Sequence, residues 1–381
     1  MSGEAPMRIG VLGGGQLGLM LAEAGEPLGF SFRFLDPNPD APAGRGRELV
    51  CAAFDDAEAI DRFADGLDVA TFEFENVGPE TLARLERLVP LRPGVRSLEM
   101  KHDRLVEKRF LQSCGLEVPR YAAVDSEDDL ATAVATVGSS SILKTRRFGY
   151  DGKGQVRIDR LDEASLRAAW EETGRAPCLL EELVEFRREL SVVLVRGLDG
   201  KCRNWPIGEN LHRGGILRRT VAPVEGVAAA TEARAWAEAL ANGLDHVGVL
   251  ALELFERTDG SLAANEFAPR VHNSGHWTIE GSQTSQFENH LRAIAGLPLG
   301  CTEAIGHAVM ANLIGVCPPT ARMLEVAGAR IHLYGKAARP GRKLGHVTAV
   351  SSDRENVLAA GIALEAVIEA STTMSAVGER S

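Results

Sequence analysis

The N-terminal sequence predicts a strand, a glycine turn and a helix in immediate succession. Arg8 to Leu12 form an apolar, strand-like run, Gly13 to Gly15 make a turn, and Gln16 to Leu28 carry apolar residues at helical spacing. Two more strands and an intervening helix are expected at residues 30–35, 69–74 and 56–64. Because strands that alternate with helices usually pair in parallel, roughly the first 100 residues predict a doubly wound parallel sheet.

Length, charge and cysteine content narrow the class of protein. A chain of 381 residues exceeds the usual size of a single core, so two or three domains are expected. The 42 basic and 53 acidic residues give a formal net charge of −11, which repels polyanions and argues against nucleic acid as a partner. The start is not leader-like, and no apolar run reaches the roughly 18 residues of a membrane span. Six scattered cysteines fit reduced thiols, so we expect a cytoplasmic protein with no membrane partner.

The pattern changes after Pro119. A small α+β lobe of antiparallel strands with a mobile loop is expected from the segments 126–137, 141–144, 155–158, 163–173 and 178–182. Beyond Arg188 strands dominate, at 190–195, 249–255, 263–267, 331–334 and 345–350, with a helix at 231–243. We therefore expect an α/β and α+β protein of three domains, at residues 1–105, 106–187 and 188–381. The tail from Ser371 to Ser381 is the one segment that suggests disorder.

The glycine turn satisfies the pattern GxGxxG with Gly13, Gly15 and Gly18, and Asp36 ends the next expected strand. Alone, this arrangement is typical of a nicotinamide dehydrogenase, with Asp36 as the acid that binds the ribose. The physical basis is less specific, because backbone N–H groups at a helix start can donate hydrogen bonds to the phosphate of any ligand. A tight turn without a ligand is the structural alternative.

A second candidate phosphate site lies between Lys144 and Gln155, where basic residues and glycines share one loop flanked by strands. Such a loop can fold over a triphosphate, since the glycines offer N–H groups and the lysines neutralise charge. The alternative is a basic surface hairpin.

Two acids downstream favour the triphosphate. Glu253 and Glu266 lie in apolar strands separated by a turn at 258–261, so a hairpin would bring both carboxylates together, with the Asn265 amide beside them. Carboxylate oxygens and nucleotide phosphates are the ligands that Mg²⁺ prefers. The alternative is a pair of solvated strand acids, since Glu253 alternates with Leu252 and Leu254.

Several motifs spread over nearly the whole chain carry a resemblance to a known family. They are Gly13-Gly-Gly-Gln-Leu-Gly18, Phe72-Glu-Phe-Glu-Asn76, Asp103-Arg104, Gly149-Tyr-Asp-Gly-Lys-Gly-Gln155, Asn265-Glu-Phe-Ala-Pro-Arg-Val-His-Asn-Ser-Gly-His276 and Ser285-Gln-Phe-Glu288. With them the chain resembles the ATP-grasp superfamily, and more closely its N5-carboxyaminoimidazole ribonucleotide synthetase family. The resemblance implies a three-domain ATP-grasp fold and a homodimer. It also implies a Mg²⁺-dependent reaction of ATP, bicarbonate and 5-aminoimidazole ribonucleotide through carboxyphosphate.

The resemblance also implies roles for individual residues. For the nucleotide these are the phosphate-binding pair Arg104 and Lys144, the lid Gly149, Tyr150, Asp151, Gly152, Lys153, Gly154 and Gln155, the adenine linker Glu181, Glu182, Leu183 and Val184, the ribose acid Glu189, and His212. Glu253 and Glu266 match the metal ligands, with Asn265 beside the second. For the substrates they are Gly15, Gln16 and Leu17 at the ribonucleotide phosphate, then Glu75, Arg270, His272, Asn273, Ser274, Lys336, Arg342 and Lys343. Tyr150, Asp151, Lys153, Arg270 and Lys336 are the expected catalytic residues.

Three positions depart from the family pattern, and two other functions stay open. Phe148 replaces a usual glycine, Leu19 a common arginine and His102 a usual glutamine. A dehydrogenase would leave the 144–155 loop and the acidic pair without a purpose. A non-catalytic nucleotide-binding subunit is disfavoured because both metal acids and the lid lysine are present. Within the superfamily, the motif around Arg270 favours the bicarbonate enzyme over its formate-using relative.

Overall fold

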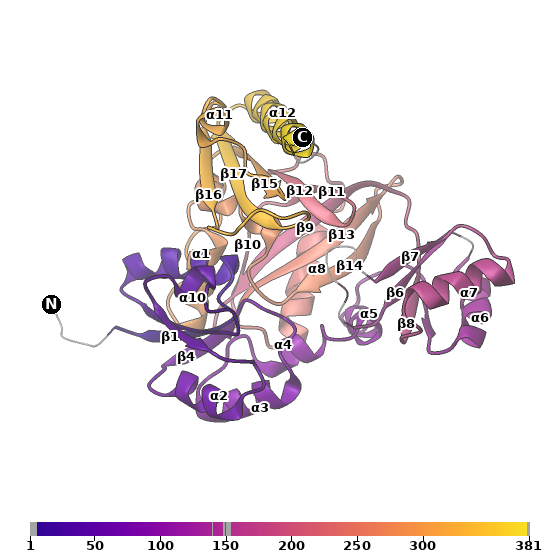
Figure 1. The fold of residues 1–381 in the computed structure, drawn as a ribbon, viewed down its shortest axis with the longest axis horizontal. Coiled ribbons are helices and arrows are strands. Elements are labelled where there is room, and N and C mark those ends of the chain that lie inside the picture. The colour runs from indigo at the N-terminus through magenta and orange to yellow at the C-terminus, as the bar shows by residue number, and fades with distance from the viewer. Residues whose placement is uncertain (1–5, 139, 148, 150–153, 379–381) are drawn as a thin grey trace.

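A computed structural model describes residues 6–138, 140–147, 149 and 154–378 of the chain. Three sheets organise it (Figure 1): a parallel sheet near the N-terminus, a small antiparallel sheet on the opposite side, and a large antiparallel sheet between and above them. The expected mixture of α/β and α+β structure is confirmed.

The N-terminal sheet is parallel throughout, in the order β3-β2-β1-β4. Its strands are β1 (Arg8–Leu12), β2 (Ser31–Asp36), β3 (Glu48–Cys51) and β4 (Val69–Phe72). The accompanying helices are α1 (Gln16–Gly25), η1 (Glu26–Leu28), η2 (Pro42–Gly44), α2 (Ala57–Ala64), α3 (Pro79–Leu88) and α4 (Val95–Glu99). Ile9 and Val11 pack on the α1 side, whereas Leu12 and Phe72 pack with α2 and α3 on the other face. Burial on both faces explains the near-continuous apolar strands.

The small sheet is antiparallel in the order β5-β8-β6-β7. It comprises β5 (Tyr121–Val124), β6 (Ser141–Thr145), β7 (Gln155–Ile158) and β8 (Cys178–Glu182). Helices α6 (Glu127–Val137) and α7 (Glu163–Glu172) cover it, and their starts are capped by the side chains of Ser126 and Asp162. Leu130, Leu143 and Trp170 form part of its own core.

The large sheet is antiparallel in all its pairings and has the order β14-β13-β9-β11-β12-β15-β17-β16, with β10 beside β9. Its strands are β9 (Phe186–Arg196), β10 (Cys202–Asn204), β11 (Gly208–Arg213), β12 (Ile216–Ala222), β13 (Gly248–Arg257), β14 (Leu262–Ala268), β15 (His307–Ile314), β16 (Ala329–Leu333) and β17 (Lys343–Ser351). The helices of this part are α5 (Arg104–Ser113), α8 (Ala230–Gly243), η3 (Asn273–Gly275), α9 (Thr278–Gly281), α10 (Gln286–Ile294), α11 (Thr320–Leu324) and α12 (Arg354–Gly378).

Helix α10 lies between the parallel sheet and the large sheet, and joins them through a buried histidine. His290 shares a 2.9 Å hydrogen bond between its Nε2 and Thr71 Oγ1, and its Nδ1 accepts the Val249 N–H at 3.0 Å. Burial lowers the pKa of His290 to about 3, so the ring is neutral at physiological pH and accepts the backbone bond. The parallel sheet and β13 are thereby fixed relative to each other.

The expectation of disorder in the C-terminal tail was wrong for residues 371–378, which continue α12. The rest of the tail, residues 379–381, lies outside the described residues. The helix is anchored by Val357 and Leu364, which are buried in the cores around β15 and β17. Within the described ranges, no helix combines the length and the apolar character that crossing a bilayer requires.

Candidate active site

A cleft with a volume of about 360 Å³ opens where the large sheet, the small sheet and the start of α5 meet. Its wall contains many of the residues expected at the nucleotide, metal and substrate positions, namely Glu75, Arg104, Lys144, Gly149, Gln155, Glu181, Glu182, Leu183, Val184, Glu189, His212, Glu253, Asn265, Glu266, Arg270, His272 and Lys343. The structure therefore brings together positions that are up to 268 residues apart in the sequence (343 minus 75).

The other expected residues lie outside this wall or outside the described chain. Gly15, Gln16, Leu17, Gly154, Asn273, Ser274, Lys336 and Arg342 are described but do not line the cleft. Tyr150, Asp151, Gly152 and Lys153, the centre of the expected lid, fall outside the described residues, as does Phe148.

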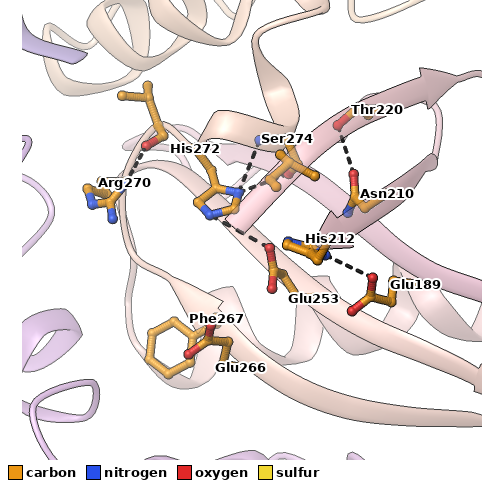
Figure 2. A network of polar contacts seen from close by, with 12 residues as sticks. Glu189, Asn210, His212, Thr220, Glu253, Glu266, Phe267, Arg270, His272 and Ser274 are labelled. Atoms are coloured by element: carbon orange, nitrogen blue, oxygen red, sulfur yellow. Dashed lines mark hydrogen bonds and ion pairs between the residues drawn. The ribbon is translucent and has the colours of Figure 1, made fainter. Parts of the chain in front are cut away.

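Glu253 on β13 and Glu266 on β14 are direct cross-strand partners, as Figure 2 shows. Leu252 and Leu254 point into the core under α8, so the alternation turns Glu253 to the opposite face of the sheet, where the cleft lies. The side chain of Glu253 is 14% exposed and that of Glu266 is 36% exposed. The alternative of two solvated strand acids is therefore wrong for Glu253, which is largely buried.

The two carboxylates differ in their electrostatic surroundings. Burial and the neighbouring charge of Glu266 raise the pKa of Glu253 to about 7. In contrast, Lys101 Nζ, which lies 2.9 Å from Glu266 Oε2, lowers the pKa of Glu266 despite its burial, and Arg104 assists from 3.5 Å. A bound cation would favour ionisation of Glu253 and reduce the repulsion between the two carboxylates, so the pair is suited to bind one.

The donor set fits Mg²⁺. In the described part of the chain no group of three or more His, Cys, Asp or Glu side chains could hold a metal ion. Two carboxylates, with an amide beside them, suit Mg²⁺, which takes its remaining ligands from phosphate oxygens and water. Asn265 also lines the cleft, next to Glu266.

Lys101 was missed by the sequence analysis. Its ammonium group contacts Glu107 and Glu266, both at 2.9 Å, and Glu107 Oε1 accepts the Phe267 N–H at 2.9 Å. Burial acts to lower the pKa of Lys101, but Glu107 and Glu266 outweigh it and raise the pKa, so the side chain stays charged. Lys101 thus places a fixed positive charge beside the acidic pair.

Glu181 is the centre of a buried ionic cluster at the opposite wall. Lys108 Nζ lies 2.6 Å from one of its oxygens, and Lys144 contacts the other. Burial alone would raise the pKa of Glu181, but the two ammonium groups lower it to about 2. Its carboxylate is therefore committed to Lys108 and Lys144 and is not available to a ligand in this state.

Glu189 and His212 face each other on β9 and β11 (Figure 2). His212 Nδ1 is 2.9 Å from Glu189 Oε2. Burial works against protonation, but the hydrogen bond to Glu189 raises the pKa of His212 above its ordinary value. This pair orients a carboxylate at the cleft wall.

Arg270 and His272 follow β14 and line the cleft. Arg270 Nη2 lies 2.8 Å from Glu75 Oε1. His272 faces the acidic pair, with its Nε2 3.7 Å from Glu253 Oε1 (Figure 2). Burial, followed by the charge of Arg270, lowers the pKa of His272, so its ring is neutral. Asn273 Nδ2 and Oδ1 are buried and meet no hydrogen-bond partner among the described residues. A buried amide without partners fits a contact with a ligand.

The glycine loop holds an internal carboxylate. Glu73 accepts the N–H groups of Gly15, Leu17 (2.9 Å) and Gly18 (3.0 Å) at the start of α1. Asp36 Oδ2 accepts the Gly14 N–H at 2.7 Å. The loop is an anion-binding helix start as expected, but its occupant here is Glu73, which the sequence analysis did not single out. Asp36 holds the loop itself and is not placed as a free ribose acid.

Lys336 connects the glycine loop with the C-terminal basic turn. Its Nζ contacts Gln16 Oε1 and lies 5.9 Å from the centre of the Tyr334 ring. Burial lowers the pKa of Lys336, and the positive charges of Arg342 and Lys343 act in the same direction, against Glu73. Lys336, Arg342 and Lys343 form a positively charged corner next to the cleft, whose wall includes Lys343.

Comparisons with known proteins agree with this geometry. Family models match in sequence order: the ribonucleotide synthetase preATP-grasp domain over residues 6–102, the ATP-grasp domain over 109–287, and the phosphoribosylaminoimidazole carboxylase C-terminal domain over 308–360. A relative from Pseudomonas aeruginosa, named N5-carboxyaminoimidazole ribonucleotide synthase, is 49% identical over 96% of this chain and 100% of its own length. This chain belongs to that family.

Solved structures of the N5-carboxyaminoimidazole ribonucleotide synthetase family share the fold. The Thermus thermophilus synthetase is 49% identical, has a TM-score of 0.89, and is matched over 94% of this chain and 98% of its own. The Aspergillus clavatus synthase, solved with ADP and 5-aminoimidazole ribonucleotide, is 29% identical with a TM-score of 0.87 over 96% and 99% of the two chains. The expected ATP-grasp fold is confirmed.

Two of the three departures from the family pattern have a structural account. Leu19 packs against the core that α1 shares with the large sheet. His102 Nε2 lies 2.8 Å from the backbone oxygen of Glu75, so the histidine holds the loop that carries this acid.

Proposed function

We propose that this chain is an ATP- and Mg²⁺-dependent ligase that carboxylates 5-aminoimidazole ribonucleotide with bicarbonate in purine biosynthesis. The products are N5-carboxyaminoimidazole ribonucleotide, ADP and phosphate. The carrying observation is the facing pair Glu253 and Glu266 in a cleft walled by cationic side chains, within this family. The ligands of the Aspergillus clavatus structure support the choice of substrates.

The nucleotide is proposed to lie between the small and large sheets. Arg104 and Lys144 would neutralise its phosphates, and the backbone of residues 181–184 would meet the base. Glu189, held by His212, would accept hydrogen bonds from the ribose. Glu253 and Glu266 would hold Mg²⁺ together with the phosphates, with Asn265 beside them. The ion, when bound, neutralises charge on the phosphoryl oxygens.

The chemistry follows from the weak electrophilicity of bicarbonate. Transfer of the terminal phosphoryl group of ATP to a bicarbonate oxygen gives carboxyphosphate and ADP. Cleavage of the bond between carbon and the bridging oxygen then releases phosphate and carbon dioxide. The ribonucleotide amine bonds to this carbon and loses a proton. Water must be excluded while carboxyphosphate exists, which a closing lid achieves.

The substrate residues divide between two neighbouring regions. Arg270, fixed by Glu75, and the neutral ring of His272 would orient bicarbonate beside the acidic pair, with Asn273 and Ser274 adjoining. Lys336, Arg342 and Lys343 would neutralise the ribonucleotide phosphate and the carboxyphosphate near Gln16. The lid residues Tyr150, Asp151 and Lys153 keep the substrate and phosphate contacts that the family resemblance implies.

The expected binding of the ribonucleotide phosphate by Gly15, Gln16 and Leu17 needs one adjustment. Because Glu73 already accepts the N–H groups of Gly15 and Leu17, these groups can bind a substrate phosphate only if Glu73 moves. We therefore propose that Lys336 and the side chain of Gln16 contribute more to phosphate binding than the glycine N–H groups do.

An omission assay tests the reaction. We expect steady ADP release with Mg²⁺, bicarbonate and 5-aminoimidazole ribonucleotide, and a loss of at least about tenfold when any one is left out, because each takes part in the transition state. Undiminished release without bicarbonate would contradict the proposal. Turnover with formate in its place would favour the formate-using relative.

Asp36→Ala separates the ligase from a dehydrogenase. Because Asp36 bonds the loop instead of a nucleotide ribose, we expect the KM for ATP to stay within about twofold of the wild type. Calorimetry with NAD is the companion measurement. Tight NAD binding that the substitution removes would contradict the assignment.

Three further expectations stay proposals. A homodimer is proposed from the family alone. Light scattering after size exclusion measures the mass.

A cytoplasmic location agrees with six cysteines that form no disulfide. The domain bounds 1–105, 106–187 and 188–381 stay a proposal, which limited proteolysis can test.

A further inference from the structure

Gln286, the first residue of α10, is fully buried and has its side-chain amide clamped onto one residue of the proposed site. Its Oε1 accepts the backbone N–H of His272 at 2.9 Å, and its Nε2 donates to the backbone oxygen of the same residue at 2.6 Å. We propose that Gln286 is a positioning residue, which fixes the main chain of His272 and thereby aims the imidazole at the acidic pair. The proposal rests on the substrate-binding role of His272 proposed above.

Gln286 is held through both its main chain and its side chain. Its backbone N–H donates to Thr278 Oγ1 at 2.9 Å, and this hydroxyl donates to the Gly275 backbone oxygen at 2.6 Å. The Gln286 Nε2 also lies 3.2 Å from His276 Nδ1. Burial lowers the pKa of His276 to about 3, so the ring is neutral, and Nδ1 accepts from the Gln286 amide in the tautomer that carries its proton on Nε2. The side chain therefore has one orientation that satisfies its amide.

The loop approaches Gln286 so closely that a side chain is excluded. A Cβ atom on Gly275 would lie 2.5 Å from Gln286 Oε1 and 2.6 Å from its carbonyl carbon. Glycine at this position is what lets η3 pack directly on the amide. This close approach is an observation independent of the hydrogen bonds, and it indicates that Gly275 packs tightly against the Gln286 side chain.

The clamp determines where the imidazole of His272 points. With its N–H and its oxygen both bound, the two peptide units that flank His272 are each held by the Gln286 amide, and the ring is then oriented by the 2.9 Å contact between Nδ1 and Ser274 Oγ. The remaining nitrogen, Nε2, faces Glu253 (Figure 2). A small misplacement at such a position can reduce the rate strongly.

Glutamine is suited to this contact because it offers a donor and an acceptor at the same reach. Methionine has no donor and only a weak sulfur acceptor. Glutamate reproduces both only when protonated, since an ionised carboxylate would face the backbone oxygen of His272 with a second acceptor. Burial would raise the pKa of such a glutamate above its ordinary value.

Two substitutions test the proposal. Gln286→Met is expected to lower kcat/KM for bicarbonate about 10- to 100-fold, the usual loss for a supporting hydrogen-bond partner, while the KM for ATP stays within about twofold. Gln286→Glu is expected to approach wild-type turnover at acidic pH and to lose it relative to wild type as the pH rises. The matched control is Gln283→Glu, at an exposed glutamine three residues earlier, which is expected to follow the wild type at each pH.

Glu253, which faces His272 and has a pKa raised to about 7, titrates in this interval, but it is present in the wild type and in every variant, so a pH dependence confined to Gln286→Glu cannot come from it. His272, His276 and His346 all have a pKa lowered by burial and stay neutral as the pH rises from 6 upward. The charged groups that act on His272 are Arg270, Lys343 and Glu266, and the first two act to lower its pKa. These groups are present in the wild type and in both Gln286 variants, so their effect cancels when the pH profile of a variant is compared with that of the wild type.

A double-mutant cycle shows whether Gln286 acts through His272. In a His272→Ala background, adding Gln286→Met is expected to lower kcat/KM for bicarbonate by less than about threefold, because the imidazole that Gln286 positions is absent. The same loss in both backgrounds, or a Gln286→Glu profile parallel to wild type, would overturn the proposal while leaving the ligase function intact. A wild type and a Gln283→Glu control that both lack bicarbonate-dependent ADP release would instead overturn the function and this role together.

Discussion

Glu266→Gln is expected to abolish turnover, with a loss of at least about 100-fold in kcat. The substitution keeps the shape of the side chain but removes the charge that balances Lys101 and Arg104 and that would hold Mg²⁺. Glu253 cannot replace it, because the site would then keep one carboxylate instead of two. Steady-state ADP release at saturating ATP is the measurement, followed by a Mg²⁺ titration of the variant.

The control for this prediction is Glu232→Gln, the same change at an exposed position on α8. It removes one negative charge far from the cleft and should leave kcat unchanged. A Glu266→Gln variant that turns over at a rate close to that of this control would remove Glu266 from the catalytic site.

The acidic pair could be foreseen from the sequence because all its determinants are local. A turn between two apolar strands sets the hairpin, and alternation turns Glu253 away from Leu252 and Leu254. The bulge after Glu253 adjusts the register, yet both acids still face each other. A hairpin thus carries enough information in a few residues to place two side chains.

The occupant of the glycine loop could not be foreseen in this way. The loop signals an anion through Gly13, Gly15 and Gly18, but its partner Glu73 lies on the segment after β4, more than 50 residues away. Lys101 is similar, since nothing in its neighbourhood along the chain indicates that it will reach Glu266. Contacts made by tertiary packing leave no periodic pattern in the sequence.

Some secondary structure was missed for a different reason. Strands β11 and β12 meet at Gly214 and Gly215, a hairpin signal, but the charged residues His212, Arg213 and Arg219 interrupt the apolar alternation. His212 lines the cleft, whereas Arg213 and Arg219 form ion pairs with Glu369 and Glu365 of α12. A functional or packing role thus overrides the propensity that sequence patterns depend on.

Glu181→Gln is expected to destabilise the folded protein by about 3 kcal/mol at neutral pH, because it leaves Lys108 buried without its counter-charge. Lys108 is 4% exposed, and its other contacts near this point are backbone oxygens of Ala264 and Asn265. Burial already lowers the pKa of Lys108, and loss of Glu181 lowers it further. The small lobe would also lose a tie to β14, so denaturant unfolding is the measurement.

The pH dependence follows from the sign of the shift. The pKa of Glu181 is about 2 in the folded protein against 4.5 ordinarily, so its stabilisation is fully present above about pH 4.5 and is lost as the pH falls toward 2. The difference between wild type and variant should therefore shrink over this interval. Glu171→Gln, which breaks the exposed pair with Arg175 on α7, is the control and should cost less than about 0.5 kcal/mol. Equal losses in the two variants would show that the buried cluster contributes no more than a surface ion pair, and the link between the small lobe and the acidic hairpin would then depend on other contacts.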